Sequence, residues 1–415
     1  MRLNASKYNE QWQDKTLNEL GDFQRGKSRH RPRNDIALFS GGKHPLIQTG
    51  EIKNTNLYLT HHSYAYNDFG LAQSKLWPKN TLCITIAANI AETALLGYPM
   101  CFPDSVVGFN AYSEQSSELF MHYVFTYIRR SIQSSATGSI QDNINIEYLT
   151  SLKFKIPLKD YQDKIAAVLS VLDAKIDSNN RINTELESMA KTLYDYWFVQ
   201  FDFPDANGKP YKSSGGKMIY NATLKREIPA GWKDKQLCQI AHITMGTSPT
   251  GGSLNDLGDG VEFFQGSTDF GWQFPTVRLY TTQPVRMAKR GDILLSVRAP
   301  VGDLNVAHID CCIGRGLAAL NSKEGYDGFL FYVMQYFKTI FDRRNSEGTT
   351  FGSITKDDLH SLPLAYPSTD LLRKYNDLVS GYNQMVFVRS MENQKLAQLR
   401  DWLLPLLMNG QVTVV

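Results

Sequence analysis

Two long stretches of the chain place apolar residues at steps of three and four, which is the spacing of an amphipathic helix. Residues 158–203 contain neither proline nor glycine. As one helix they would span roughly 70 Å at about 1.5 Å per residue. A second such stretch follows Pro367, and the heptad-like spacing predicts that the two helices bury their stripes on each other as an antiparallel coiled coil. The residues that we expect in this seam or against a partner are Ile165, Leu169, Leu172, Ile176, Leu186, Met189, Leu193, Trp197, Leu396, Leu399 and Leu403.

About 140 residues of mixed pattern precede each predicted helix. Each of these segments contains a short apolar run bounded by turn residues, Thr81–Ile86 in the first and Asp292–Val297 in the second. Runs of this length and composition are typical of buried strands. The chain is therefore expected to contain two α+β globules, each followed by a long helix.

The two halves of the chain are copies of one another. One set of matches is displaced by 220 positions, and a later set by 210. The first copy therefore has about ten extra residues, which we place in a variable surface loop between Gly26 and Lys79 because insertions are tolerated where backbone is exposed. The matched residues are Trp12, Asp14, Lys15, Leu17, Gly26 and Ser28 with Trp232, Asp234, Lys235, Leu237, Gly246 and Ser248, then Leu149, Ser151, Leu152 and Pro157 with Leu359, Ser361, Leu362 and Pro367.

A stretch rich in proline, glycine and serine separates the copies, which is typical of a linker. The predicted divisions are residues 1–155 for the first globular domain, 156–203 for the central helix, 204–231 for the linker, 232–366 for the second globular domain and 367–415 for the C-terminal helix.

One string matches a phosphate-binding loop letter for letter, from Gly21 to Ser28. Such a loop needs a buried strand before it and a helix after it. Here the segment that follows is Arg29-His30-Arg31-Pro32-Arg33, and the second copy lacks both the first glycine and the lysine. We therefore reject a nucleotide site. No other catalytic or metal-binding motif is found, so the chain is not expected to be an enzyme.

Charge and cysteine content narrow the setting. The net charge is only +3, so any binding of a polyanion has to come from local patches. Five cysteines without a C-x-x-C pair indicate neither a disulfide framework nor a zinc ribbon, which favours a reducing cytoplasm. No secretory signal or membrane span is expected.

The strongest local patch is basic. Six cationic or titratable side chains lie within residues 25–33 of the first copy, whereas the matching loop of the second copy is neutral and rich in hydroxyls. Such cations are suited to contacting DNA phosphates and base edges, although a solvated charged loop has the same composition. The candidate DNA-binding residues are Arg25, Lys27, Arg29, Arg31, Arg33 and Lys43 in the first copy, and Thr247, Ser248, Arg278, Lys289, Arg298 and Arg315 in the second.

These features resemble the specificity subunit of type I restriction-modification systems over nearly the full length. The resemblance rests on Trp12 with Leu17-x-x-Leu20-Gly21, on the run Gly291–Gly302, on Tyr196–Phe201 and on the C-terminal Leu403–Gly410. The first copy departs from the strand motif, with Ala87, Ala88, Asn89 and Ala91 where the second has Arg298, Ala299, Pro300 and Gly302.

The resemblance implies two target-recognition domains, each reading one half of a bipartite, asymmetric site in double-stranded DNA, with the helices setting the distance between the halves. It implies two modification (methyltransferase) subunits and, in the larger complex, two restriction subunits as partners. S-adenosylmethionine, ATP and Mg²⁺ would be bound by those partners and none by this chain.

Two alternatives stay open at this point. The aromatic residues Tyr194, Tyr196, Trp197, Phe198, Phe201 and Phe203 either dock a partner or cap the helix pair against the globules. The whole chain is alternatively a non-catalytic scaffold that presents loops to proteins or glycans, which the weak net charge favours slightly. DNA binding through several arginines predicts a steep salt dependence, whereas the scaffold does not.

Overall fold

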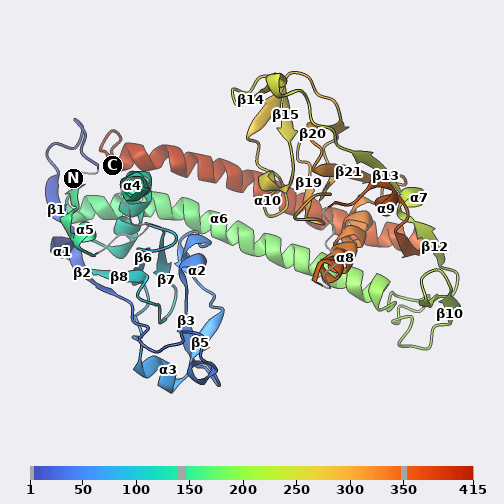
Figure 1. Cartoon of the computed structure of the whole chain (residues 1–415), viewed down its shortest axis with the longest axis horizontal. Helices are drawn as coiled ribbons and strands as arrows, with labels where there is room; N and C mark the ends of the chain where they lie inside the picture. The colour runs from blue at the N-terminus through green and yellow to red at the C-terminus, as the bar shows by residue number, and fades with distance from the viewer. Residues whose placement is uncertain (1–3, 138–145, 347–352, 415) are drawn as a thin grey trace. The chain divides into compact units, whose positions relative to one another are not determined.

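The computed structural model describes residues 4–137, 146–346 and 353–414. The chain divides into two compact units, Met1–Asn179 with Glu392–Val415 and Asn180–Met391. Each unit combines one globular domain with part of each of two long helices, α6 (Lys159–Tyr194) and α10 (Thr369–Met408). The predicted α+β fold with duplicated domains and two long helices is confirmed (Figure 1).

The first globular domain is built on a five-stranded sheet of order β2-β8-β6-β7-β4. Its main core combines this sheet with α4, with α6 and with the end of α10. A second cluster, which includes Ile47, Trp77 and Phe102, is also built on this sheet. The elements are β1 (Gln13–Thr16), α1 (Leu17–Leu20), β2 (Gly21–Arg25), η1 (Ile36–Leu38), β3 (His44–Leu46), α2 (Thr49–Lys53), β4 (Tyr58–Leu59), β5 (Tyr64–Tyr66), α3 (Asp68–Ala72), β6 (Leu82–Thr85), β7 (Thr93–Leu96), β8 (Val106–Ala111), α4 (Glu118–Thr137), α5 (Ile146–Ser151) and β9 (Lys153–Ile156).

The second domain repeats this plan, with sheets of order β13-β21-β18-β19 and β14-β16-β15-β20-β17. A hairpin of β10 and β11 precedes it. The elements are β10 (Met218–Asn221), β11 (Arg226–Pro229), β12 (Lys233–Gln236), α7 (Leu237–Ile240), β13 (Ala241–Met245), η3 (Gly251–Ser253), β14 (Leu254–Asn255), β15 (Val261–Phe264), η4 (Ser267–Asp269), β16 (Leu279–Thr281), β17 (Met287–Ala288), β18 (Ile293–Ser296), β19 (Leu304–Val306), β20 (Cys311–Ile313), β21 (Leu317–Ser322), α8 (Asp327–Ser346), α9 (Lys356–His360) and β22 (Pro363–Tyr366).

The repeat is visible in the strand register. Gln13 pairs with Ile156 in the first domain, and Lys233 pairs with Tyr366 in the second. These partners differ by the same 220 and 210 positions that the sequence matches give. The predicted buried strands are also confirmed, because every residue of β6 and of β18 is buried.

The segment between Gly26 and Lys79, where the extra residues of the first copy are expected, contains short elements as well as loops. It includes a paired β3 and β5 together with α2, α3 and η1, whereas residues 26–35 have no helix or strand. Leu38, Leu46 and Tyr66 of this segment form a small core with Cys101. Part of the segment is therefore a packed substructure.

The buried positions between α6 and α10 follow a strict heptad. Two of the residues expected among them, Met189 and Leu399, lie outside it. Met189 is 51% exposed and Leu399 is 42% exposed, because their neighbours Ala190 and Arg400 turn inward instead. In each unit, asparagine also enters the seam. Asn179 donates to Glu392 and Asn393 in the first unit, and Asn183 donates to Ser390 in the second.

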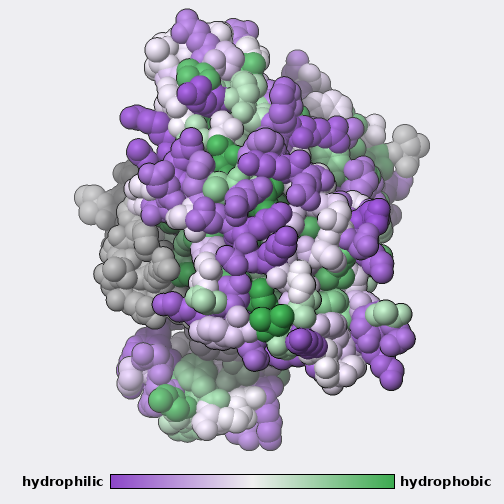
Figure 2. Space-filling model, turned by 90° about the vertical axis from the view of Figure 1, so that its right-hand side faces the viewer, coloured by the Kyte–Doolittle hydropathy of each residue, from purple (hydrophilic) through white to green (hydrophobic). Residues whose placement is uncertain are grey.

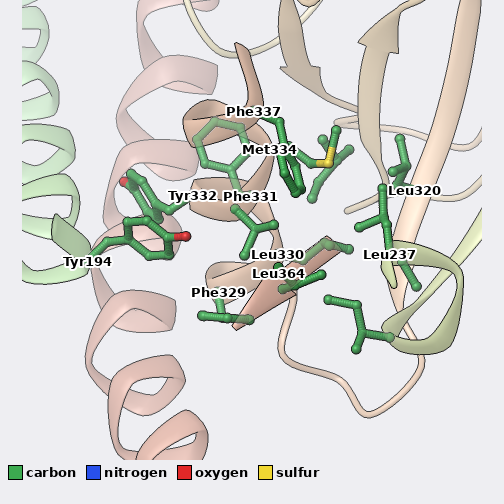
Figure 3. Packing of buried hydrophobic residues seen from close by; sticks show 14 of the residues in the cluster. Tyr194, Leu237, Leu320, Phe329, Leu330, Phe331, Tyr332, Met334, Phe337 and Leu364 are labelled. Atoms are coloured by element: carbon green, nitrogen blue, oxygen red, sulfur yellow. The ribbon is translucent and has the colours of Figure 1, made fainter. Parts of the chain in front are cut away.

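Most of the aromatic group at the end of α6 caps the helices against the second globular domain, whereas Tyr196 is 39% exposed. Tyr194, Trp197 and Phe198 are 6–7% exposed and belong to the core of the second unit. Figure 3 shows Tyr194 facing Tyr332 of α8, with ring centroids 5.9 Å apart. Trp197 is thus a core residue in a π-helical turn, Asp195–Val199. Of its two expected roles the structure supports the contact with the other helix, because its ring centroid lies 6.0 Å from that of Tyr375 of α10.

Candidate nucleic-acid interface

The basic segment of the first domain starts where β2 ends. Arg25, Lys27 and Arg29 are exposed, and among the described residues none of them makes an ion pair. The backbone beneath them is fixed, since Gln73 Oε1 accepts hydrogen bonds from the amides of Arg29 (2.6 Å) and His30 (3.1 Å). The three cations are therefore presented to solvent from an anchored backbone.

The remaining cations of this segment differ in how far they are engaged. Arg31 is exposed, and its Nη1 donates to the carbonyls of Ser28 and His30. Arg33 donates to both carboxylate oxygens of Asp104, at 2.8 and 3.1 Å, so its charge is already partnered. Lys43 is exposed and lies at the start of β3.

One further cation of this site, Lys75, is not apparent from the sequence. Lys75 Nζ donates to Gln24 Oε1 at 3.0 Å and lies 3.7 Å from the centre of the Trp77 ring. Burial, and then the neighbouring charge of Lys27, lower the pKa of Lys75. Lys75 is far from Lys27 in sequence, so only the folded chain shows that their charges interact.

The second domain presents a different set at the equivalent place. Ser248 Oγ donates to Gln265 Oε1 at 3.0 Å and accepts from the amide of Arg315 at 3.3 Å. Thr247 is exposed, and its amide donates to Ile313. Gly26 approaches the carbonyl of Pro103, and its repeat mate Gly246 approaches that of Gly314, so at this point the copies are displaced by 211 positions. Arg315 therefore stands where the first domain has Asp104, a cation in place of a carboxylate.

Two of the expected basic residues of the second domain are already paired with carboxylates of that domain. Arg278 pairs at 2.5 Å with Asp269, whose side chain is 4% exposed. Lys289 pairs at 2.7 Å with Asp310, and this hydrogen bond raises the pKa of Lys289. Arg298 and Arg315 are exposed. They are the better candidates for an external anion.

The string that resembles a phosphate-binding loop has a different structure. Gly21–Arg25 is the edge strand β2, paired with β8. Residues 26–35 contain no helix. The helix N-terminus that would cradle a phosphate is missing at this place.

The described residues offer no further candidate for a metal site or a membrane span. In the parts of the chain that the structure describes, no group of three His, Cys, Asp or Glu residues is placed to hold a metal ion. No helix there is long and apolar enough to cross a membrane. On the face drawn in Figure 2, hydrophilic residues predominate and hydrophobic ones form small separate patches.

The chain thus combines two copies of one α+β domain, each with exposed cations at one end of a sheet, with two long paired helices. Comparison with known proteins assigns its family. The chain matches the type I restriction modification DNA specificity domain over residues 9–188 and 229–371, and it belongs to that family. Members of this family are specificity subunits, and they are not the catalytic ones.

Relatives support the assignment over different lengths. The MjaX specificity subunit of a type I restriction enzyme from Methanocaldococcus jannaschii is 33% identical over 278 residues, which is 66% of this chain and 62% of that protein. The MjaIX specificity subunit of the same organism is 23% identical over 97% of this chain and 94% of its own length. The S subunit of a type I restriction-modification system from M. genitalium shares the fold, with a TM-score of 0.59 at 18% identity over 98% of this chain and 99% of that one.

Proposed function

We propose that each globular domain reads one half of a bipartite site in double-stranded DNA, as the specificity subunit of a type I restriction-modification complex. The observation that carries this proposal is the exposed cation group Arg25, Lys27 and Arg29 beside the end of β2, with Arg315 beside the equivalent strand end of the second domain. Exposed cations without a carboxylate partner are free to contact phosphates. Differently decorated loops on one scaffold would read different half-sites.

The salt dependence of DNA binding tests this proposal. A map of N6-methyladenine in the source strain, with the gene intact and deleted, supplies the target motif. With a duplex of that motif, we expect the triple variant Arg25→Gln, Lys27→Gln, Arg29→Gln to lower the slope of log K against log salt by about three, one for each phosphate contact. Binding near physiological salt should weaken about ten- to hundred-fold.

The chain provides a matched control. Lys212, Lys217 and Lys225 are exposed residues of the segment that joins the domains. Replacing these three by glutamine removes the same charge, and the slope should stay at the wild-type value. A wild-type slope near zero would contradict DNA binding and favour the scaffold that presents loops to proteins or glycans.

The proposal also places two modification subunits on the helices. Met189 of the second unit and Leu399 of the first are repeat equivalents, and both are large, apolar and exposed. Each has an exposed aromatic residue nearby. Tyr196 lies seven residues beyond Met189, and Trp402 lies three beyond Leu399. Exposed apolar and aromatic side chains of this kind are favoured at protein interfaces. S-adenosylmethionine, ATP and Mg²⁺ would then be bound by the modification and restriction subunits.

Single substitutions test this docking. We expect Met189→Asp and Leu399→Asp each to weaken the binding of one modification subunit about ten-fold or more, because a charge is buried in the contact. Native mass spectrometry of the assembled complex would then show one modification subunit instead of two. Val285→Asp, at a 46% exposed residue of the second globular domain, is the control. Full occupancy in both helix variants would place the docking surface elsewhere.

A further inference from the structure

The first domain ends in a rigid tip that is formed by the residues around η1, β3, β5 and α3. These elements lie at the end of the domain away from α6 (Figure 1). Asn67 Nδ2 donates to the carbonyls of Ala37 and Ser40, at 2.9 and 3.1 Å. Gly70 of α3 approaches Leu38 so closely that a Cβ there would lie 2.6 Å from the Leu38 carbonyl oxygen. The tip is thus held by packing and by hydrogen bonds.

An aliphatic side chain stands out from this tip. Ile36 is 81% exposed, although the next residue but one, Leu38, is buried. The backbone around Ile36 is held by Asp35. The Asp35 carboxylate accepts a hydrogen bond from the amide of Ala37 at 3.0 Å and pairs with His30 at 2.8 Å. Phe69 of α3 is 55% exposed, and its ring meets the His30 ring edge-on at 5.6 Å.

Cations precede and follow Ile36 in the chain. The exposed residues Arg29 and Arg31 lie within the seven positions before it, and Lys43 follows it within the same tip, whereas Arg33 is paired with Asp104. The two carboxylates of the tip, Asp35 and Asp68, are paired with His30 and His44. A surface for docking a protein usually presents a contiguous apolar patch of several hundred Å². Isolated apolar side chains among cations instead match proteins that insert a hydrophobic wedge between base pairs while their cations hold the phosphates.

We propose that Ile36, together with Phe69 of the same tip, is a wedge that partly unstacks one base step of the half-site bound by the first domain. This inference rests on the proposed function. Pyrimidine–purine steps unstack most easily. The first half-site should therefore be read partly through its deformability, at a position where no side chain contacts a base edge. Ile36 lies in the segment where the first copy has its extra residues, so the second half-site should lack this distortion.

The test uses the full chain assembled with its modification subunits on the target duplex. 2-Aminopurine replaces each base of the first half-site in turn, away from the adenine that is methylated. On binding, we expect a rise in fluorescence at one step. Ile36→Ser should abolish this rise and weaken binding about ten-fold. Ile36→Leu should retain both, which separates loss of the wedge from any damage to the fold.

The second domain offers a matched control in Leu257, which is 82% exposed and is followed two positions later by Asp259. Leu257→Ser should change neither signal nor affinity. An unchanged fluorescence rise in Ile36→Ser would exclude the wedge. If Ile36→Ser instead weakened the binding of a modification subunit and left the DNA distortion intact, Ile36 would be a protein contact and not a wedge. Failure of the proposed function is distinguishable, because wild-type protein would then bind the duplex with no salt dependence.

Discussion

Arg400→Ala is expected to destabilise the first unit by about 3–5 kcal/mol, because it leaves a buried carboxylate without its cation. Arg400 Nη1 donates to Asp173 Oδ1 at 2.7 Å, and the Asp173 side chain is 2% exposed. Tyr123 donates its hydroxyl to the other oxygen at 2.6 Å. Asn56 joins Asp173 and Arg400 through hydrogen bonds of 3.2 and 2.9 Å. Urea denaturation of the full chain would measure the loss.

The repeat supplies a sharp control for this prediction. The positions equivalent to Asp173 and Arg400 in the second copy are Asn383 and Ala190, so that copy has no such ion pair. The double variant Asp173→Asn, Arg400→Ala places the residues of the second copy in the first. It should recover a substantial part of the stability that Arg400→Ala loses, because no buried charge is left unpaired. Arg373→Ala breaks an exposed pair with Asp370 and should cost less than about 1 kcal/mol. An equal, small cost for Arg400→Ala would show that solvent reaches Asp173.

The periodic and repeated features of this fold could be predicted from sequence. The β6 and β18 strands follow from their apolar runs, and the paired registers Gln13–Ile156 and Lys233–Tyr366 follow from the displacements between the copies. The apolar runs are local features of the sequence, and the registers are carried by the repeat. Neither depends on long-range packing.

The helix seam could be predicted only in part, because the rule that apolar residues face inward fails at its centre. Asn179 and Asn183 are 1% and 2% exposed and are hydrogen-bonded across the seam, while Met189 faces solvent. A heptad fixes which positions face inward, and buried asparagine is tolerated there because it specifies register. Choosing residues by hydrophobicity therefore selected Met189 where the heptad places Ala190.

For the candidate DNA-binding site, the sequence was enough to predict that several cations are exposed. It was not enough to predict which cations are paired with carboxylates, because the partners are distant in sequence. Arg33 meets Asp104 from 71 positions away, and the sequence gives no sign of this pair. The short elements of the tip that carries Ile36 could not be predicted from sequence, since they are held by side-chain hydrogen bonds and tight packing more than by any periodic pattern.

A second large effect is expected from pH, through His122 of α4. His122 is 2% exposed, and its Nδ1 lies 3.1 Å from the Thr93 hydroxyl. Burial lowers the pKa of His122 to about 4, from the ordinary 6.5. Between pH 6.5 and about 4, His122 is therefore mostly protonated in the unfolded chain and mostly neutral in the folded chain. Stability is complete above that pH and falls by about 1.4 kcal/mol per pH unit as the pH drops toward 4.

Comparing wild type with His122→Gln isolates this contribution, because the other titrating groups are common to both proteins. At pH 5, relative to pH 7.5, wild type should lose about 2 kcal/mol more than the variant. The urea transition to follow is the one that Arg400→Ala shifts, since both residues belong to the first unit. His61→Gln removes an exposed histidine and should keep the full wild-type loss. Parallel pH profiles for wild type and His122→Gln would mean that His122 is protonated in the folded chain, with its charge accommodated between Thr93 and the nearby Asp173.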